Sequence, residues 1–154
     1  MPPLPVVDPL LQYDRSPGGN DNFRSSDEFE LPASLNQHGW KALHVSGSAS
    51  IASLEQIRRL QPSPSNPVVV LDVRQESHAI VGGYPCTWRS PDNWANVGKS
   101  SDEVLADEQA RIEQLKTRQS VRILHRKDVK NSVDNPRSVT LDQPQIFSEE
   151  ELVR

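Results

Sequence analysis

The chain has one cysteine, Cys86, few aromatic residues and no long apolar run. A single cysteine excludes an internal disulfide framework and a zinc site built from several cysteines. Hydrophobic residues make up 34% of the 154 positions, whereas a typical globular domain is roughly 45–50% apolar when glycine is counted. No segment approaches the ~18 apolar residues of a membrane span, and the N-terminus lacks the basic region of a Sec signal peptide. We therefore expect no membrane partner, and either a cytoplasmic location or secretion by a route that needs no such signal.

The charge balance is mildly acidic, with 17 Lys and Arg against 21 Asp and Glu and a formal net charge of -4. A chain of this charge is a poor candidate for coating nucleic acid. The four histidines are scattered, with no pair at the i, i+4 spacing of a helical ligand pair: His38, His44, His78 and His125. We therefore expect no nucleic-acid partner, no metal site and no cofactor. These counts do not fix the oligomeric state.

Prolines and the Gly18-Gly19 pair punctuate residues 1–35, which show no sustained apolar period. This composition predicts an extended or disordered lead-in that docks only in places. Order is expected to begin near Trp40, where Leu43 and Val45 indicate a short strand that enters a turn at Ser46-Gly47-Ser48.

A helix followed by a buried strand is predicted next. Ser53 and Gln56 fit a capping box at the start of a short amphipathic helix that carries Leu54, Ile57 and Leu60. The β-branched run Val68–Leu71, with proline before it and charge after it, is typical of a fully buried strand. This order of elements favours α/β packing with a parallel sheet.

The second half of the chain is predicted to hold a loop, two helix starts and two strands. Residues 82–99 contain several turn residues and are predicted to form a long packed loop. Ser100 and Glu103 fit a second capping box that opens a helix over about 103–118. The remaining predictions are an inner helix face of Leu105, Ile112 and Leu115, strands over 121–124 and 138–141, and a final helix turn capped by Ser148 and Glu151, with Phe147 packing on Leu152.

Four groups of residues could carry chemistry, and each also has an ordinary structural interpretation. A phosphate-cradling cysteine loop needs an arginine six positions after Cys86, but Asp92 stands there, which favours a packing role for the cysteine. Polar residues that follow a central strand can form a site wall or an ion-pair network that fixes the loop, and the spacing favours the network. Those residues are Asp72, Arg74, Glu76 and His78. The cluster His125, Arg126, Lys127 and Lys130 is more typical of a solvated loop, and Asp107 with Arg111 of a surface ion pair.

One long run has a more specific resemblance. Residues 71–112, LDVRQESHAIVGGYPCTWRSPDNWANVGKSSDEVLADEQARI, resemble a stretch of the protein-tyrosine-phosphatase-like inositol phosphatases, the bacterial phytases. That family carries a D-L-R-Q-E-S-H-G run, a V-S-W element, a D-W-x-N-x-G-K loop and an L-A-D-E helix. Residues 22–24 (NFR), 42–48 (ALHVSGS) and 149–152 (EEEL) resemble further family pieces. Two departures are Ala79, where the family has glycine, and Asn93, where it has aspartate.

The resemblance implies a fold and a domain division. The expected fold class is α/β, the front part of a protein-tyrosine-phosphatase-like domain with an inserted small partial β-barrel, and Val68–Val73 would be a core strand. The corresponding segments are the lead-in 1–35, an N-terminal part of the α/β domain over 36–120, a partial-barrel segment over 121–145 and a helix start over 146–154.

The resemblance also implies a reaction. In the family a cysteine in an H-C-x-x-G-x-x-R loop attacks phosphorus, and an aspartate in a T-D-H loop protonates the leaving alcohol. Neither motif occurs in these 154 residues, so no catalytic residue is assigned and Cys86 cannot replace the nucleophile. Two matched positions would face substrate: Arg24 would bind a phosphate of an inositol polyphosphate, and Asp107 would face the inositol ring.

The sequence therefore predicts an N-terminal fragment of a cysteine-dependent phosphatase that acts on inositol polyphosphates and is inactive as given. The alternative is a non-catalytic secreted effector or interaction module derived from the same family. The expected partner of the complete enzyme is an inositol polyphosphate.

Overall fold

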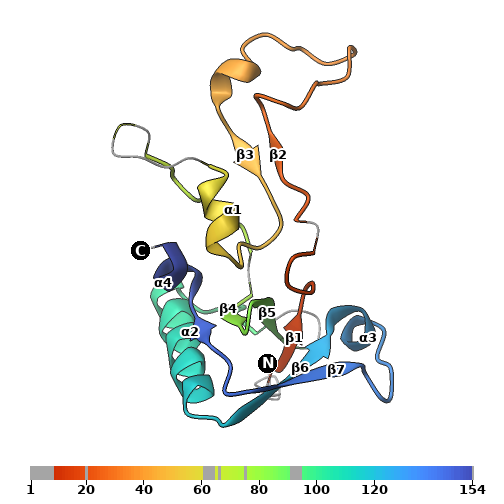
Figure 1. Cartoon of the computed structure of the whole chain (residues 1–154), viewed down its shortest axis with the longest axis vertical. Coiled ribbons are helices and arrows are strands. Elements are labelled where there is room, and N and C mark those ends of the chain that lie inside the picture. Colours follow the sequence, from red (N-terminus) through yellow and green to blue (C-terminus); the bar gives the residue numbers. More distant parts are fainter. Residues whose placement is uncertain are drawn as a thin grey trace. The chain divides into compact units, whose positions relative to one another are not determined.

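The computed structural model describes residues 9–19, 21–60, 65, 67–74, 76–90 and 95–153. These residues fall into two compact units (Figure 1). The first unit comprises residues 1–17 and 52–154, and the second comprises residues 18–51. Each unit is described by itself below.

A six-stranded sheet forms the centre of the first unit (Figure 1). Its strands, in spatial order, are β7 (Ser138–Asp142), β6 (Ser120–His125), β1 (Leu10–Tyr13), β5 (Tyr84–Arg89), β4 (His78–Val81) and β8 (Ile146–Phe147). Only β1 and β6 pair in parallel, and every other neighbouring pair is antiparallel. The predicted α/β class is confirmed, whereas the predicted parallel sheet is wrong because the strand on which it rested does not join the sheet. The sheet does not close into a barrel.

The β4–β5 hairpin corrects the prediction of a loop over residues 82–99. Gly82 and Gly83 both have positive φ, 56° and 79°, as the two central residues of a type I′ hairpin turn require. Tyr84–Arg89 then forms a largely buried strand. The carbonyl of Pro85 accepts the N–H of Asp14, one residue beyond β1, so the N–H that proline lacks falls at the end of the ladder.

The strand β1 was not predicted, because the sequence placed these residues in an extended or disordered lead-in. Its four residues pair with β5 on one side and with β6 on the other. A four-residue strand directly after Pro9 is too short to show an alternating apolar pattern.

One face of the sheet packs against helix α2 (Ser101–Lys116). The predicted capping box is confirmed, because the Ser100 hydroxyl accepts the N–H of Glu103 and the Glu103 carboxylate accepts the N–H of Ser100. Ile112 and Leu115 are buried, whereas Leu105 is 63% exposed, so the predicted inner face is right for two of its three residues. The core cluster consists of Ala79, Val81, Cys86, Trp88, Ile112, Leu115, Val121, Ile123 and Ile146.

Three short helices complete the first unit: α1 (Leu54–Arg58), α3 (Arg126–Lys130) and α4 (Glu149–Val153). The predicted hydroxyl caps of α1 and α4 are confirmed, but the Gln56 side chain accepts the N–H of Ala52 and not that of Ser53, so the reciprocal half of the α1 capping box is wrong. Ser53 accepts the N–H of Gln56, and Ser148 accepts the N–H of Glu151 while the Glu151 carboxylate accepts the N–H of Ser148. The two predicted strands at 121–124 and 138–141 lie within β6 and β7, and α3 occupies part of the turn predicted between them.

Residues 68–73 are the largest disagreement with the sequence reading. They belong to no helix or strand, and Val69, Leu71 and Val73 are 81%, 83% and 90% exposed. The prediction of a buried core strand over Val68–Val73 is therefore wrong for this structure. The apolar pattern indicates that the segment could be buried as a strand. Burial as a strand also requires neighbouring strands, and none pairs with this segment among the described residues.

The second unit is organised by a small antiparallel pair, β2 (Arg24–Ser25) and β3 (Ser46–Gly47). A 3-10 helix, η1 (Lys41–Leu43), precedes β3, so Leu43 lies in a helical turn and not in the predicted strand. The buried Ser26 joins the two sides, because its N–H donates to the carbonyl of Val45 and its hydroxyl accepts the N–H of Val45.

Among the residues with described structure, no helix is long and apolar enough to cross a membrane.

Candidate functional site

A carboxylate held between two cations lies on α2. Asp107 Oδ2 accepts hydrogen bonds from Arg111 Nε at 2.9 Å, one helical turn further on, and from Lys99 Nζ at 3.3 Å, from the loop before the helix. Partial burial would raise the pKa of Asp107, but the bonds and charges of Arg111 and Lys99 outweigh burial and lower it. The carboxylate is therefore ionised at neutral pH, and its two partners carry positive charge that can also attract a phosphate.

A second network connects α2 to the start of β4. Glu108, the next residue on the helix, accepts the backbone N–H of His78 at 2.8 Å, and its carboxylate lies 3.4 Å from His78 Nδ1. The other ring nitrogen, Nε2, lies 3.0 Å from Asp72 Oδ2. Arg74 donates to both carboxylate oxygens of Asp72, at 3.0 and 2.6 Å. This arrangement is the predicted ion-pair network for Asp72, Arg74 and His78, whereas Glu76 contributes its backbone carbonyl, 3.1 Å from His78 Nδ1.

The pKa of Asp72 shows the strength of that network. Partial burial alone would raise it, but the side-chain and backbone hydrogen bonds from Arg74, together with the charges of Arg74 and His78, lower it. A carboxylate stabilised in its charged form by a two-pronged guanidinium has a fixed orientation. His78 thus joins the chain before β4 to α2 through Glu108, the residue that follows Asp107.

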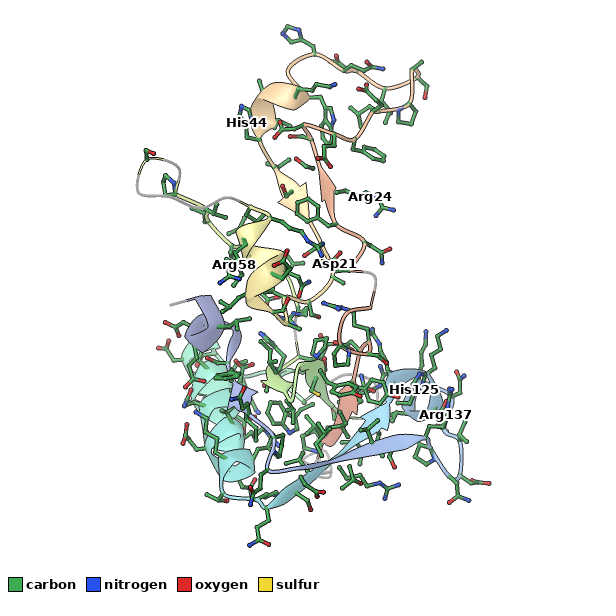
Figure 2. The ribbon with its side chains drawn as sticks, viewed as in Figure 1. Asp21, Arg24, His44, Arg58, His125 and Arg137 are labelled. Carbon is green, nitrogen blue, oxygen red and sulfur yellow. The ribbon has the colours of Figure 1, made fainter. Side chains whose placement is uncertain are left out.

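Arg24, the second predicted substrate residue, is exposed at the start of β2, and Figure 2 shows its side chain extending away from the hairpin. Its partner across the ladder is Gly47, so two of the segments that carry the family resemblance, 22–24 and 42–48, lie side by side. Arg24 belongs to the second unit and Asp107 to the first.

Cys86 lies in β5 within the core and is 1% exposed. Burial raises the pKa of its thiol, and the nearby charge of Asp14 raises it further. A buried, protonated thiol is a poor nucleophile. The packing role favoured by the sequence is confirmed.

The basic cluster predicted as a solvated loop is more ordered than expected. Arg137, from the start of β7, forks onto Asp128 of α3 at 2.7 and 2.8 Å and also donates to His125 Nδ1 at 3.2 Å (Figure 2). These hydrogen bonds from Arg137 hold the pKa of Asp128 far below its usual range. Tyr13 packs edge-on against the His125 ring, with ring centroids 5.2 Å apart. The Arg137–Asp128 pair with His125 is therefore structural, whereas Arg126, Lys127 and Lys130 of the predicted cluster are exposed, as expected of a solvated segment.

Two residues of the α2 site were missed by the sequence reading, Lys99 and Glu108. Both lie inside the quoted run that resembles the phytases, in its G-K and D-E pairs. The i, i+4 rule found Arg111 as a partner of Asp107, but no local rule connects Lys99 or His78 to the helix, because these contacts span 8 and 30 positions in sequence. Within the described residues no group of three metal-ligating side chains occurs. Asn93, one of the two departures from the family pattern, lies outside the described residues.

Comparison with known proteins finds one curated relative and two solved structures with a similar fold. The chain is similar to effector protein hopD2 of Pseudomonas syringae pv. tomato, with 36% identity over 133 residues that cover 85% of this chain and 28% of the effector. No family model matches the chain. Two solved structures from Mitsuokella multacida match it with a TM-score of 0.73, at 23% identity and over 96% of this chain. One is a PTP-like myo-inositol phosphatase in complex with myo-inositol-(1,3,4,5)-tetrakisphosphate, and the other is a tandemly repeated protein tyrosine phosphatase-like phytase.

The chain has the fold of part of a PTP-like inositol phosphatase. The resemblance stated from residues 71–112 is thereby confirmed at the level of the fold. The chain spans 28% of the length of the effector and 26% of each phosphatase chain. The relation to phosphatases is therefore a relation to one portion of those proteins, and their activities are not transferred by the match alone.

Proposed function

We propose that the chain is the N-terminal part of a PTP-like phosphatase and that it supplies binding residues for an inositol polyphosphate. The observation that supports this most directly is the fold, which is shared over 96% of the chain with a phosphatase solved together with an inositol tetrakisphosphate. In this proposal Arg24 binds a phosphate group of the substrate and Asp107 faces the inositol ring.

The surroundings of Asp107 suit that role. Asp107 Oδ2 accepts both cation bonds, so Oδ1 can accept a hydrogen bond from a ring hydroxyl. Lys99 and Arg111 are about one-third and one-quarter exposed, and their remaining N–H groups can donate to phosphate oxygens. A carboxylate beside phosphates would repel them on its own, but two cations in contact with it leave the cluster with net positive charge.

Hydrolysis needs groups that these residues do not supply. The nucleophile and general acid of the family lie in H-C-x-x-G-x-x-R and T-D-H motifs, and the 154-residue sequence contains neither. The only cysteine is the buried, protonated Cys86. The proposed role of this chain is thus binding without turnover.

The second candidate is a non-catalytic effector or interaction module that uses the same surface. It is favoured by one observation, the effector named among the similar proteins at 36% identity. An effector that keeps the phosphatase fold and binds a phosphorylated ligand would satisfy both proposals. Ligand binding without turnover therefore supports both proposals, whereas a chain that binds no inositol polyphosphate would leave only the interaction module.

The test is isothermal titration calorimetry of inositol hexakisphosphate into the wild-type chain and into Arg24→Ala. Loss of a charge-assisted hydrogen bond costs ~1.5–3 kcal/mol. At about 1.4 kcal/mol per decade, the dissociation constant should rise roughly ten- to hundredfold. The control is Arg58→Ala, which removes an exposed arginine from α1 and should leave the affinity unchanged.

Asp107→Asn separates affinity from turnover. Asparagine keeps an acceptor for the ring hydroxyl but loses the charge that orients Lys99 and Arg111. In an enzyme completed by a catalytic loop, we expect turnover to fall by more than the affinity does. Asp102→Asn is the matched control on the same helix. If Arg24→Ala and Asp107→Asn both stay within about twofold of their controls, a gap too small for a lost charged hydrogen bond, the assignment of these residues is wrong.

A further inference from the structure

One carboxylate oxygen of Asp107 is occupied and the other is open. Oδ2 accepts hydrogen bonds from Arg111 Nε at 2.9 Å and from Lys99 Nζ at 3.3 Å. Within the described residues no hydrogen bond reaches Oδ1, and the Asp107 side chain is 30% exposed. Because an ionised carboxylate oxygen can only accept, Oδ1 is open to a ligand that brings a hydroxyl or an N–H group.

The two cations beside Asp107 keep most of their donors. Arg111 uses one of the five N–H groups of a guanidinium on Asp107, and Lys99 uses one of the three of an ammonium. Both side chains are partly exposed, so ligands in solution can reach them. Guanidinium and ammonium groups form their strongest hydrogen bonds with anions such as phosphate. An acceptor and two phosphate donors therefore lie in direct contact with one another.

A phosphate is a poor neighbour for Oδ1 itself. Glu103 lies one helical turn before Asp107, on the same side of α2. Its carboxylate accepts the N–H and the hydroxyl hydrogen of Ser100, and these bonds, together with the charge of Lys99, lower the pKa of Glu103. A fully ionised phosphate at Oδ1 would thus bring another acceptor and more negative charge to two ionised carboxylates. A hydroxyl brings a donor without charge, and its hydrogen bond to a charged group is stronger than one between neutral groups.

We propose that the cluster of Lys99, Asp107 and Arg111 selects inositol polyphosphates that carry a free ring hydroxyl next to a phosphate. The hydroxyl donates to Asp107 Oδ1, and the phosphate on the neighbouring carbon accepts from Lys99 and Arg111. This inference rests on the proposed function and deepens it, because it names the ligands that the same residues prefer. Inositol hexakisphosphate has a phosphate at every position and lacks the donor, so it should be a weaker ligand than an inositol pentakisphosphate.

Other ligand chemistries satisfy only part of the cluster. A ligand with phosphates alone leaves Oδ1 without a donor and adds like charge beside it. A ligand with hydroxyls alone leaves the remaining N–H groups of Lys99 and Arg111 without an anion. Neighbouring carbons of an inositol ring place a hydroxyl and a phosphate side by side, as a carboxylate in direct contact with two cations requires.

Isothermal titration calorimetry of the wild-type chain compares inositol hexakisphosphate with the set of myo-inositol pentakisphosphates, each of which carries one hydroxyl. The measurement is made at about pH 8, because the second pKa of a phosphate ester is about 6 and a phosphate that keeps its proton could itself donate to Oδ1. One charge-assisted hydrogen bond changes a dissociation constant roughly ten- to hundredfold. We therefore expect at least one pentakisphosphate to bind about tenfold more tightly than the hexakisphosphate, although it carries fewer charges.

Substitutions at Asp107 should remove this preference in steps. Asp107→Asn keeps a neutral acceptor, whose hydrogen bonds are roughly half as strong, so the ratio of the two dissociation constants should fall. Asp107→Ala has no acceptor, and the more highly charged hexakisphosphate should then bind at least as tightly as any pentakisphosphate. The matched control is Asp102→Asn, the same loss of charge at an exposed position of α2, which should keep the wild-type ratio.

Two results would overturn this inference alone. They are a hexakisphosphate that binds the wild type as tightly as every pentakisphosphate, and a preference for a pentakisphosphate that survives Asp107→Ala. In both cases the chain still binds inositol polyphosphates, so the proposed function stands. A wild-type chain that binds none of these ligands overturns the proposed function, and this inference with it.

Discussion

The packing of α2 on the sheet decides where Asp107 and Glu108 lie, and it can be tested by two substitutions on the same helix. Leu105 and Ile112 are both aliphatic residues and lie seven positions, one heptad, apart on α2. The sequence predicts both on the inner face of the helix. The structure separates them, because Ile112 is 1% exposed and Leu105 is 63% exposed. Ile112→Ala should therefore destabilise the protein strongly, whereas Leu105→Ala should not.

The size of the difference follows from burial. Ile→Ala at a fully buried position costs ~2–5 kcal/mol, since the apolar contacts are lost and a cavity remains. A substitution at an exposed position away from special features stays within about 0.5 kcal/mol. For a protein of this length, each 1 kcal/mol changes the melting temperature by roughly 2–4 °C. Ile112→Ala should thus lower it by about 4–20 °C, and Leu105→Ala by about 2 °C or less.

The assay is urea unfolding followed by far-UV circular dichroism and by the fluorescence of tryptophan, one of which, Trp88, lies in the core. The dichroism follows the helices directly, while the fluorescence checks that the core unfolds with them. An equal slope of free energy against urea in both variants would show that the unfolded states are comparable. If Leu105→Ala costs as much as Ile112→Ala, α2 is rotated from the position described, and the placement of Asp107 and Glu108 fails with it.

Two further predictions concern activity and pH. The 154-residue chain should release no phosphate from inositol hexakisphosphate above a buffer blank, because its one thiol is buried and protonated; release that survives Cys86→Ser would show that the nucleophile lies elsewhere in this chain. The folded state lowers the pKa of Asp72, Asp107 and Asp128, so their contribution to stability is complete above the unfolded pKa of about 3.9 and is lost as the pH falls through the folded values. The urea midpoint should therefore decline below about pH 4, and less so in Asp128→Asn; a midpoint that is constant down to about pH 3 would contradict this.

Local signals in the sequence predicted the helix starts well. The hydroxyl of Ser100 and the carboxylate of Glu103 satisfy N–H groups within one turn, so the capping box depends on few residues and on no distant contact. The same holds for Ser53 and for Ser148. The strands at 121–124 and 138–141 were found for a similar reason, because their apolar alternation matches an antiparallel pair with one buried face.

Elements that depend on distant partners were not predictable by these rules. Tyr84–Arg89 contains proline and cysteine and shows no alternation, and it is a strand because β1 and β4 flank it. The contacts Lys99–Asp107 and His78–Glu108 likewise join residues 8 and 30 positions apart, beyond the reach of a local rule. The family resemblance did include these residues. It compares the whole run 71–112, so it contains both members of pairs, such as His78 and Glu108, that only the fold brings together.

Segment 67–73 shows what the apolar pattern does and does not measure. The five apolar residues of this mostly β-branched run indicate a strand that could be buried on both faces, and this prediction depends on the sequence alone. Burial itself needs neighbours with an open backbone edge, and within the described residues the sheet offers none that is apolar on both faces. The misprediction has one cause: the segment carries the side chains of an interior strand, but no strand pairs with it within the described residues.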